Sequence, residues 1–416
     1  MCFRIASVTA LLWYALLASS PAHGGGPPPV HPVTFNDALQ AASRAPANRS
    51  RIVSQQAAAM SVDAAGAWPA ITVGTFTTLR SARLGVSAAV PLPILGTRYT
   101  RDANVSVAKT LRDVVVADAA TQELEQLRQV SRAWLNVARM QAHAATSQLA
   151  AVRQQQLAEI ADQRFNNGEV ARVESVQADA ARRLARARAA ADRAAIAAAS
   201  AELASLLGWN PEIIIEAQGD LPTPYSVPSL TAIQAQRNTH PLVHAQAARI
   251  AVEAAKTKLA SASQWPRLAV EAEAAWLAPN PPSTDLRLGV VVELPFWGKS
   301  SQAVQTAQAL KHVAQLETEV AAHVLDGATV AAYRRFEAAR AQAATLQNEV
   351  VPAAREAALL ARAAYAEGSG GLVAVLEAER SLQEIESTAT DARLDAAEAQ
   401  VDVTWTYGAL PQLGHP

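Results

Sequence analysis

The chain has 416 residues; half are apolar, only 5% are aromatic, and alanine is the most frequent residue. Because alanine favours helix and buries little surface per residue, this composition predicts long, closely packed helices rather than one large globular core. The formal net charge of -1 excludes the strongly basic balance that is typical of nucleic-acid-binding proteins.

Residues 1–22 have the pattern of a secretory signal peptide. Arg4 supplies a positive charge, an apolar run extends from Val8 to Leu17, and Ser20-Pro21-Ala22 provides small residues for cleavage. A membrane anchor is the alternative, but the apolar run is short for a bilayer. Cys2, the only cysteine, precedes this run and would be removed with it. The mature chain would then hold no disulfide, catalytic thiol or thiolate metal site.

The rest of the sequence is organised as an internal repeat. The paired landmarks are Trp68-Pro69 with Trp265-Pro266, Pro93 with Pro295, Gly96 with Gly298, Phe165 with Tyr365, Gly168 with Gly368, Ala178 with Ala378, and Gly208 with Gly408. Their common order at nearly constant separations indicates a duplication, because shared alanine content alone would not align glycines and Trp-Pro pairs.

The predicted organisation follows from these landmarks. It comprises the signal peptide at 1–22, an extended mature N-terminus at 23–33, repeat one at 34–210, a linker at 211–229, repeat two at 230–411 and a tail at 412–416. Prolines and glycine punctuate the linker at Pro211, Gly219, Pro222, Pro224 and Pro228.

Each repeat predicts the same succession of a helix, two strands, a long helix, a turn and a second long helix. In repeat one the strands are expected at about 68–80 and 83–95, and the helical turn at about 164–172. Neither glycine nor proline occurs from Thr97 to Asn167, a run that would extend about 105 Å as a helix. In repeat two the strands are expected at about 266–277 and 285–296, and the turn at about 364–372. Gly327 and Pro352 predict irregularities in its first long helix.

The strand patterns alternate strictly in repeat two. Leu286, Leu288, Val290 and Val292 share one face, and charged residues occupy the other. Repeat one alternates less clearly, because Thr75 and Thr77 fall on its apolar face. A water-soluble sheet packed on a core is the alternative reading. Each strand is nevertheless long enough to cross a bilayer in a barrel. Four strands cannot close a barrel, so a membrane-spanning chain of this kind must oligomerise.

The sequence contains no catalytic constellation, and no enzyme activity, cofactor or metal is expected. His240 and His244 have helical spacing, but no carboxylate cluster joins them, and Pro241 suits a helix start. We expect them to be a solvent-facing pair. No glycine-rich phosphate loop precedes a helix, so any step driven by nucleotide hydrolysis would depend on a partner. Basic residues such as Arg182 and Arg183 lie beside acidic ones and read as a solvated helix face.

These motifs together resemble the TolC-type outer-membrane efflux proteins over nearly the whole mature sequence. The stretch from Arg164 to Ala171 resembles the first periplasmic helical turn of that family, and Tyr365-Ala366-Glu367-Gly368 resembles the second. Val90 to Gly96 and Glu293 to Lys299 resemble the strand-to-helix exits. The resemblance implies a mainly helical fold with β-strands, in which a homotrimer forms a twelve-stranded outer-membrane barrel continued by a periplasmic α-helical tunnel.

The same resemblance implies partners and mechanical sites. The partners would be outer-membrane lipid, a periplasmic adaptor, and an inner-membrane pump of the resistance-nodulation-division or ABC type, with no nucleic acid. The tip turns expected to meet the adaptor contain Gly168, Glu169, Val170, Gly368, Ser369 and Gly370.

The resemblance also suggests a pore constriction at the tip. By position, Glu174 and Tyr365 match gate residues of the family, and Glu377 keeps a second acidic position. Gly370 stands where a gate arginine would be and Ala374 where a gate aspartate would be. Arg172 is the remaining candidate for the missing cation, and the candidates at the constriction are therefore Glu174, Arg172, Tyr365 and Glu377.

The leading interpretation is thus a passive outer-membrane conduit of a tripartite efflux or secretion system. The alternative is a periplasmic coiled-coil scaffold or adaptor whose strands form a soluble sheet. The apolar strand faces of both repeats favour the conduit. Drug, heavy-metal and protein cargo stay open, because the pump selects the cargo.

Overall fold

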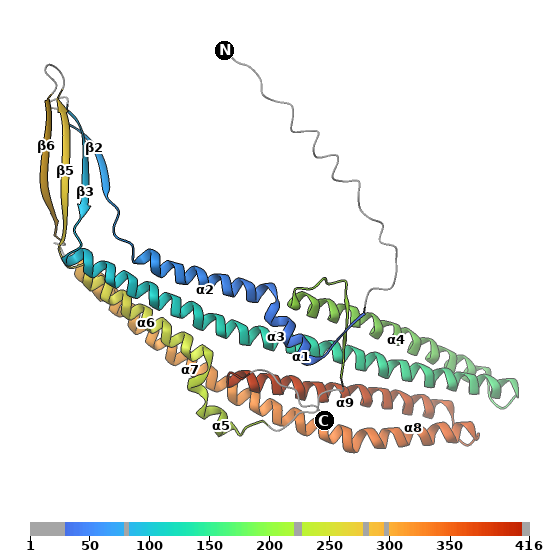
Figure 1. The fold of residues 1–416 in the computed structure, drawn as a ribbon. Coiled ribbons are helices and arrows are strands. Elements are labelled where there is room, and N and C mark those ends of the chain that lie inside the picture. The colour runs from blue at the N-terminus through green and yellow to red at the C-terminus, as the bar shows by residue number, and fades with distance from the viewer. Residues whose placement is uncertain (1–29, 79–82, 220–226, 278–282, 295–298, 410–416) are drawn as a thin grey trace, which may run out of the picture.

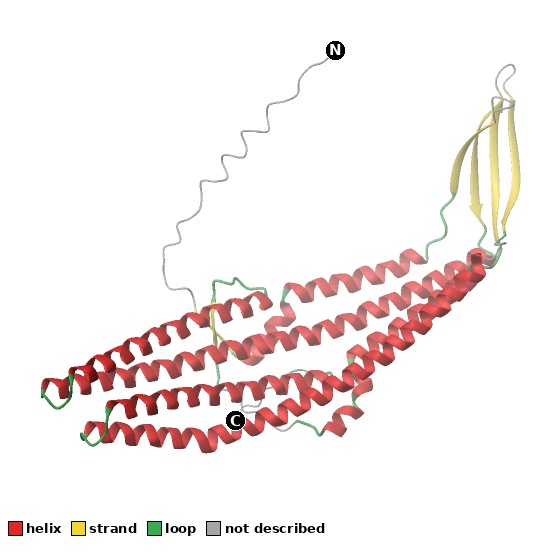
Figure 2. Ribbon diagram, turned by 180° about the vertical axis from the view of Figure 1, so that it is seen from behind, coloured by secondary structure: helices red, strands yellow, loops and turns green. Residues whose placement is uncertain are grey.

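The computed structural model describes residues 30–78, 83–219, 227–277, 283–294 and 299–409. The molecule is elongated, with a β-sheet at one end and a long bundle of helices that ends in two helical turns at the other (Figures 1 and 2). The expected signal peptide and the C-terminal tail lie outside the described residues.

Both repeats follow the predicted succession of elements, which confirms the two-repeat plan. Repeat one contains α1 (Phe35–Arg44), α2 (Pro46–Ala65), β2 (Thr72–Thr78), β3 (Arg83–Pro91), α3 (Leu95–Asn166) and α4 (Arg172–Leu207). Repeat two contains α5 (Leu230–Ala235), a 3-10 turn (Arg237–Thr239), α6 (Pro241–Ala262), β5 (Arg267–Leu277), β6 (Ser283–Glu293), α7 (Lys299–Thr345), a π-helical turn (Leu346–Val350), α8 (Val351–Ala366) and α9 (Leu372–Thr406).

The four long strands form one antiparallel sheet in the order β2-β3-β5-β6. Val90, Val270 and Val290 lie opposite one another on successive strands, so the apolar face is continuous across the sheet. Glu273 and Arg287 are paired on the opposite face. Val290 is 62% exposed on the apolar face, which a single chain leaves uncovered.

The helices are arranged side by side in two tiers, and α3 runs through both (Figure 1). Near the sheet, α2 packs on α3, α3 on α6, and α6 on α7. Toward the turns, α4 packs on α3, α3 on α9, and α9 on α8. None of the described helices is long and apolar enough to cross a membrane.

The main core lies where the two tiers meet. Phe35 packs edge-on against Trp134, with 5.4 Å between ring centres, and the Trp134 indole donates a hydrogen bond to the carbonyl of Val33. Leu203 of α4 and Leu394 of α9 are fully buried in the same cluster. A short parallel pair, β1 (Val30–Val33) with β4 (Ile214–Ala217), covers this core. The sequence did not predict that pair, because both segments read as extended connections.

The structure bears differently on the two helix irregularities expected in repeat two, at Gly327 and at Pro352. Gly327 lies inside an unbroken α7, so that expectation was wrong; Leu325 and Thr329 are both buried and anchor the helix around it. The irregularity near Pro352 takes the form of the π-helical turn directly before α8, with Pro352 in the first turn of that helix. Proline suits this place because the first helical turn needs no amide donor.

The prediction of a solvent-facing histidine pair is also wrong for His240. Its side chain is completely buried at the N-terminus of α6, where the ring accepts a hydrogen bond from the amide of Leu242. The other ring nitrogen lies 3.0 Å from the carbonyl oxygen of Trp405. Burial lowers the pKa of His240, so the neutral ring caps the helix and ties it to α9.

Candidate functional site at the helical tip and the repeat seam

The two turns at the tip have the same backbone geometry. After α3, Gly168 adopts a φ of 78°, and after α8, Gly368 adopts a φ of 80°. The amide of Glu169 donates to the carbonyl of Arg164, and the amide of Ser369 donates to the carbonyl of Ala364. Left-handed backbone closes each helix end at little cost only in glycine, which explains the repeated glycine in the sequence.

Tyr365 joins the two hairpins at the tip. Its side chain is buried in a cluster that draws on α3, α4 and α9 as well as on its own helix. The hydroxyl donates a hydrogen bond of 3.3 Å to Glu174 of α4. Burial and the nearby carboxylate of Glu174 both raise the pKa of Tyr365, so the phenol stays a neutral donor.

Arg164 supplies a cation at this contact. Its guanidinium donates a 2.8 Å hydrogen bond to the carbonyl of Tyr365 and lies 4.8 Å from the centre of the Tyr365 ring. It also pairs with Glu169 at 3.2 Å. Its side chain is only 14% exposed, so water competes little for these contacts.

The other two candidates do not join this contact. Arg172 and Glu377 are both exposed, and neither forms an ion pair with another residue that the structure describes. Arg164 is not among the gate positions that the family resemblance implies, so the sequence did not mark it as the cation of the tip. The sequence signal for Arg164 is its position in the last turn of α3, just before the tip glycine Gly168.

The glycines of the second turn differ in the space around them. A Cβ at Gly370 would lie 3.1 Å from the Cβ of Ala364, which requires a local shift. A Cβ at Gly371 would meet no atom within 4 Å. The second turn therefore tolerates a side chain at one position and resists it at the other.

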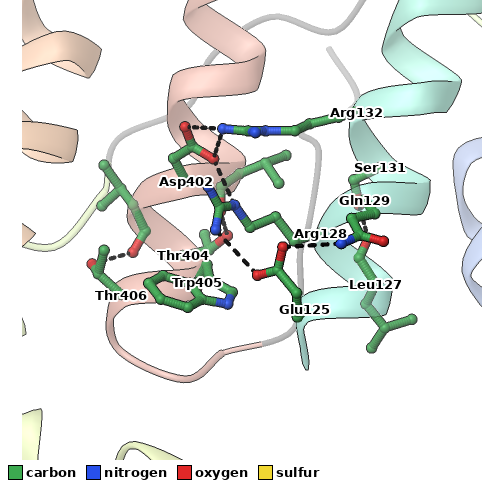
Figure 3. Close-up of polar contacts among 12 residues, drawn as sticks. Glu125, Leu127, Arg128, Gln129, Ser131, Arg132, Asp402, Thr404, Trp405 and Thr406 are labelled. Atoms are coloured by element: carbon green, nitrogen blue, oxygen red, sulfur yellow. Dashed lines mark hydrogen bonds and ion pairs between the residues drawn. The ribbon is translucent and has the colours of Figure 1, made fainter. Parts of the chain in front are cut away.

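A second charged region joins the repeats along α3 and α9, and we call it the repeat seam. Arg128 and Arg132 of α3 both bind the carboxylate of Asp402, at 3.0 and 2.6 Å (Figure 3). The Arg128 guanidinium also lies over the ring of Trp405, 4.8 Å from its centre. Glu125 forms a further ion pair with Arg128, as Figure 3 shows.

The repeat seam continues toward the tip, again with basic residues on α3 and acidic residues on α9. Arg139 contacts Asp395 at 2.7 Å and Glu398 at 3.1 Å, and its side chain is 19% exposed. His143 lies 2.9 Å from Asp391. Burial raises the pKa of Glu398, and the positive charge of Arg139 partly offsets this rise.

The least exposed member of the seam is Glu379, whose side chain is 2% exposed. Arg153 of α3 contacts it at 2.9 Å and Arg362 of α8 at 2.8 Å. One carboxylate thus connects three helices. The sequence showed basic residues on one helix and acidic residues on the other, but only their antiparallel packing brings them together.

The described residues contain no group of three or more histidine, cysteine, aspartate or glutamate side chains that could hold a metal ion. What the tip and seam can do is mechanical: they fix the two helical hairpins of one chain against each other.

Comparison with known proteins extends this picture. Residues 232–409, which are nearly all of repeat two, match the family model described as outer membrane efflux protein. No curated protein sequence matches the chain.

Solved structures match the chain over most of its length. The outer membrane protein VceC of Vibrio cholerae has a TM-score of 0.73 at 16% identity, covering 91% of this chain and 97% of that one. A membrane protein of Pseudomonas aeruginosa has a TM-score of 0.74 at 18% identity, with coverages of 90% and 93%. The CmeC outer membrane channel of Campylobacter jejuni has a TM-score of 0.69 at 16% identity, with coverages of 90% and 85%.

These structural likenesses show a common fold that includes both repeats. The family match adds a likeness in sequence to outer membrane efflux proteins, and it extends over repeat two.

Proposed function

We propose that the chain is an outer-membrane efflux protein that works as a passive conduit, through which an inner-membrane pump drives solutes by way of a periplasmic adaptor. The observation that supports this most directly is the open four-stranded sheet, whose continuous apolar face is exposed on one chain. A sheet that stayed in water would bury such a face against a core, and none of the helices that the structure describes covers it (Figure 2).

The sheet has one apolar face and one charged face, as a barrel wall between lipid and water requires. Val270 and Val290 lie on the apolar face, whereas Glu273 and Arg287 lie on the other. We assign the apolar face to lipid and the charged face to the channel. The open edges at β2 and β6 would then be unpaired in the membrane, which is not tolerated, so several copies must close the sheet. The proposed assembly is a homotrimer with a closed barrel of twelve strands.

The helices carry the conduit away from the membrane. The 72 residues of α3 correspond to a length of about 108 Å, so the tip turns lie far out in the periplasm when the sheet is in the outer membrane. We assign the turns around Gly168 and Gly368 to contact with the adaptor, and Glu174 and Tyr365 to the narrow end of the pore.

Two measurements test this function. Cell fractionation should place the chain in the outer membrane, released only by detergent, and the purified oligomer should conduct ions in planar lipid bilayers. A protein that washes off the membrane with salt and forms no channels would instead be the periplasmic scaffold. A monomer in mild detergent with intact strands would exclude the ring.

A further inference from the structure

A cavity of about 520 Å³ lies where the β-sheet joins the helices (Figure 1). Its walls come from the end of α2 and the segment before β2, the first turns of α3, and the ends of β3, β5 and β6 that are nearest the helices. The volume is within the range of about 300–1,000 Å³ that is typical of small-molecule sites. Neither the tip nor the repeat seam includes these residues.

The sheet turns mainly its charged face toward the cavity. Pro91, Ala269 and Val291 border it, and they lie opposite one another on β3, β5 and β6. Because successive residues of a strand point to opposite faces, these three lie on the face opposite to that of Val90 and Val270. In the proposed conduit this is the face toward the channel.

The first turns of α3 contribute polar side chains to the cavity. Thr97, Thr100, Arg101 and Asn104 all border it. Residues three, four and seven positions apart share one face of a helix, so these four side chains lie along the same stripe of α3. The cavity is therefore bordered by small apolar residues of the sheet and by polar residues of the helix.

Arg101 is held in place by contacts within the chain. Its Nε donates a 2.7 Å hydrogen bond to the carbonyl of Gly66, and its guanidinium lies 4.6 Å from the centre of the Trp68 ring. The carboxylate of Asp102 lies 3.6 Å from Nη1, and the Arg101 side chain is 29% exposed. Its two Nη groups form no hydrogen bond with another residue that the structure describes, so they can bind an anionic group.

Arg267 adds a second cation at the start of β5. It borders the cavity and lies 3.9 Å from Glu293, whose side chain is 72% exposed. An ion pair of this length between solvent-exposed groups is weak, so Arg267 can exchange Glu293 for another anion. Two guanidinium groups and one carboxylate border the cavity, which gives this part of the described chain a positive charge.

The hydroxyl of Thr97 is an unpaired polar group in the wall of the cavity. Thr97 is only 5% exposed, and its Oγ1 has no hydrogen-bond partner among the described residues. Buried hydroxyl groups in folded proteins are nearly always hydrogen-bonded. An oxygen atom of a bound molecule would supply the missing acceptor.

We propose that this cavity binds an amphiphilic organic anion. Arg101 and Arg267 bind its carboxylate or sulfonate group, because guanidinium N–H groups pair well with two oxygens of one acid. The Thr97 hydroxyl donates to the same group, and Ala269 and Val291 contact the apolar part. The inference deepens the proposed function, on which the assignment of the cavity to the channel rests: organic anions would occupy this site on their way through the conduit.

Titration calorimetry on the oligomer in non-ionic detergent tests the ligand class with three compounds of similar shape. Naphthalenesulfonate should bind, and neutral naphthalenemethanol and cationic naphthylmethylammonium should bind about tenfold more weakly or less, because they cannot accept from two guanidinium groups. Inorganic sulfate should also bind weakly, since it lacks an apolar part. Equal affinities for the three naphthalene compounds would overturn the proposal.

Substitutions test whether the sulfonate binds at the proposed residues. Arg101→Gln and Arg267→Gln should each lower the affinity for naphthalenesulfonate about tenfold. The matched control is Arg98→Gln, at an arginine of the same helix that is 70% exposed and does not border the cavity. Thr97→Val should lower the affinity without lowering the melting temperature, because the hydroxyl has no partner to lose among the described residues. An equal loss in Arg98→Gln, or unchanged affinity in both cavity arginine variants, would overturn the site.

Conductance in planar bilayers separates this inference from the proposed function. Naphthalenesulfonate should reduce the single-channel current of the unsubstituted protein, and less so that of Arg267→Gln. If the protein conducts but binds the sulfonate no better than the other two compounds, this inference is wrong and the conduit stands. If the sulfonate binds at Arg101 and Arg267 but no channels form, the binding site stands and the proposed function is wrong.

Discussion

The guanidinium of Arg164 lies 4.8 Å from the ring centre of Tyr365 and donates to the carbonyl of the same residue. These two residues come from different repeats, so the contact holds the two tip turns of one chain together. The Tyr365 hydroxyl adds a longer bond to Glu174, at 3.3 Å. Within one chain, the two tip turns are thus joined by a cation that is not among the constriction candidates expected from the sequence.

Arg164→Ala should raise single-channel conductance in planar bilayers more than Glu174→Ala does. Both bonds involve a charged group and belong to the class that contributes about 1.5–3 kcal/mol. The Arg164 bond is the shorter of the two, at 2.8 Å against 3.3 Å, and Arg164 also contacts the Tyr365 ring, so we expect its loss to cost more. Arg172→Ala is the control and should leave conductance unchanged, because Arg172 is exposed and forms no ion pair with a described residue. A larger increase from Glu174→Ala would show that the phenol contact, not Arg164, is the latch.

An arginine introduced into the second tip turn should affect folding and conductance differently at Gly370 and at the neighbouring Gly371. Gly371→Arg should fold normally and lower conductance, because its Cβ has free space and the guanidinium can approach the acidic residues of the tip. Gly370→Arg should destabilise the turn, since its Cβ would press on Ala364. Measuring the melting temperature as well as the conductance of each variant separates a loss of stability from a change in the pore. Equal melting temperatures for the two variants would contradict this prediction.

Glu379→Gln should be among the most destabilising changes in the bundle. It leaves Arg153 and Arg362 facing a side chain without charge in a site where the carboxylate is 2% exposed. Removing one partner of a buried ion pair costs about 3–5 kcal/mol. Denaturant unfolding of the detergent-solubilised protein would measure the loss. Arg183→Ala, at an arginine that is 76% exposed, is the control and should cost at most about 1 kcal/mol.

His240 should make stability depend on pH. Burial lowers its pKa in the folded chain, so the unfolded chain binds a proton more readily. Stability from this group is therefore present above the ordinary histidine pKa of about 6.5 and is lost as pH falls from there toward the lowered value. His240→Asn keeps a side-chain oxygen for the Leu242 amide and should flatten this part of the pH profile. An unchanged profile in the variant would place the dependence elsewhere.

The two faces of β6 should respond unequally to charge. Val290→Arg should cost about 2–4 kcal/mol of stability in lipid vesicles, because it places a cation on the apolar face near mid-membrane. Val291→Arg, on the opposite face, should cost clearly less. Equal costs at the two positions would mean that the strands do not cross the bilayer in this register.

The repeat, the strands and the long helices could all be predicted from local patterns. Period-two alternation around Val290 and the absence of breakers from Thr97 to Asn167 depend only on neighbouring residues. The glycines at Gly168 and Gly368 marked the tip turns for the same reason, since positive φ is a local demand of the backbone.

Contacts between distant segments could not be predicted in this way. The burial of His240 depends on Trp405, the latch at Tyr365 on Arg164, and the pairing of β1 with β4 on two segments far apart in the chain. A charged or polar residue on a helix reads as solvated until its partner helix is placed against it. Which face of α3 meets α9 is set by how the whole chain packs, because side-chain pairing across helices depends on rotation and register that no local pattern contains.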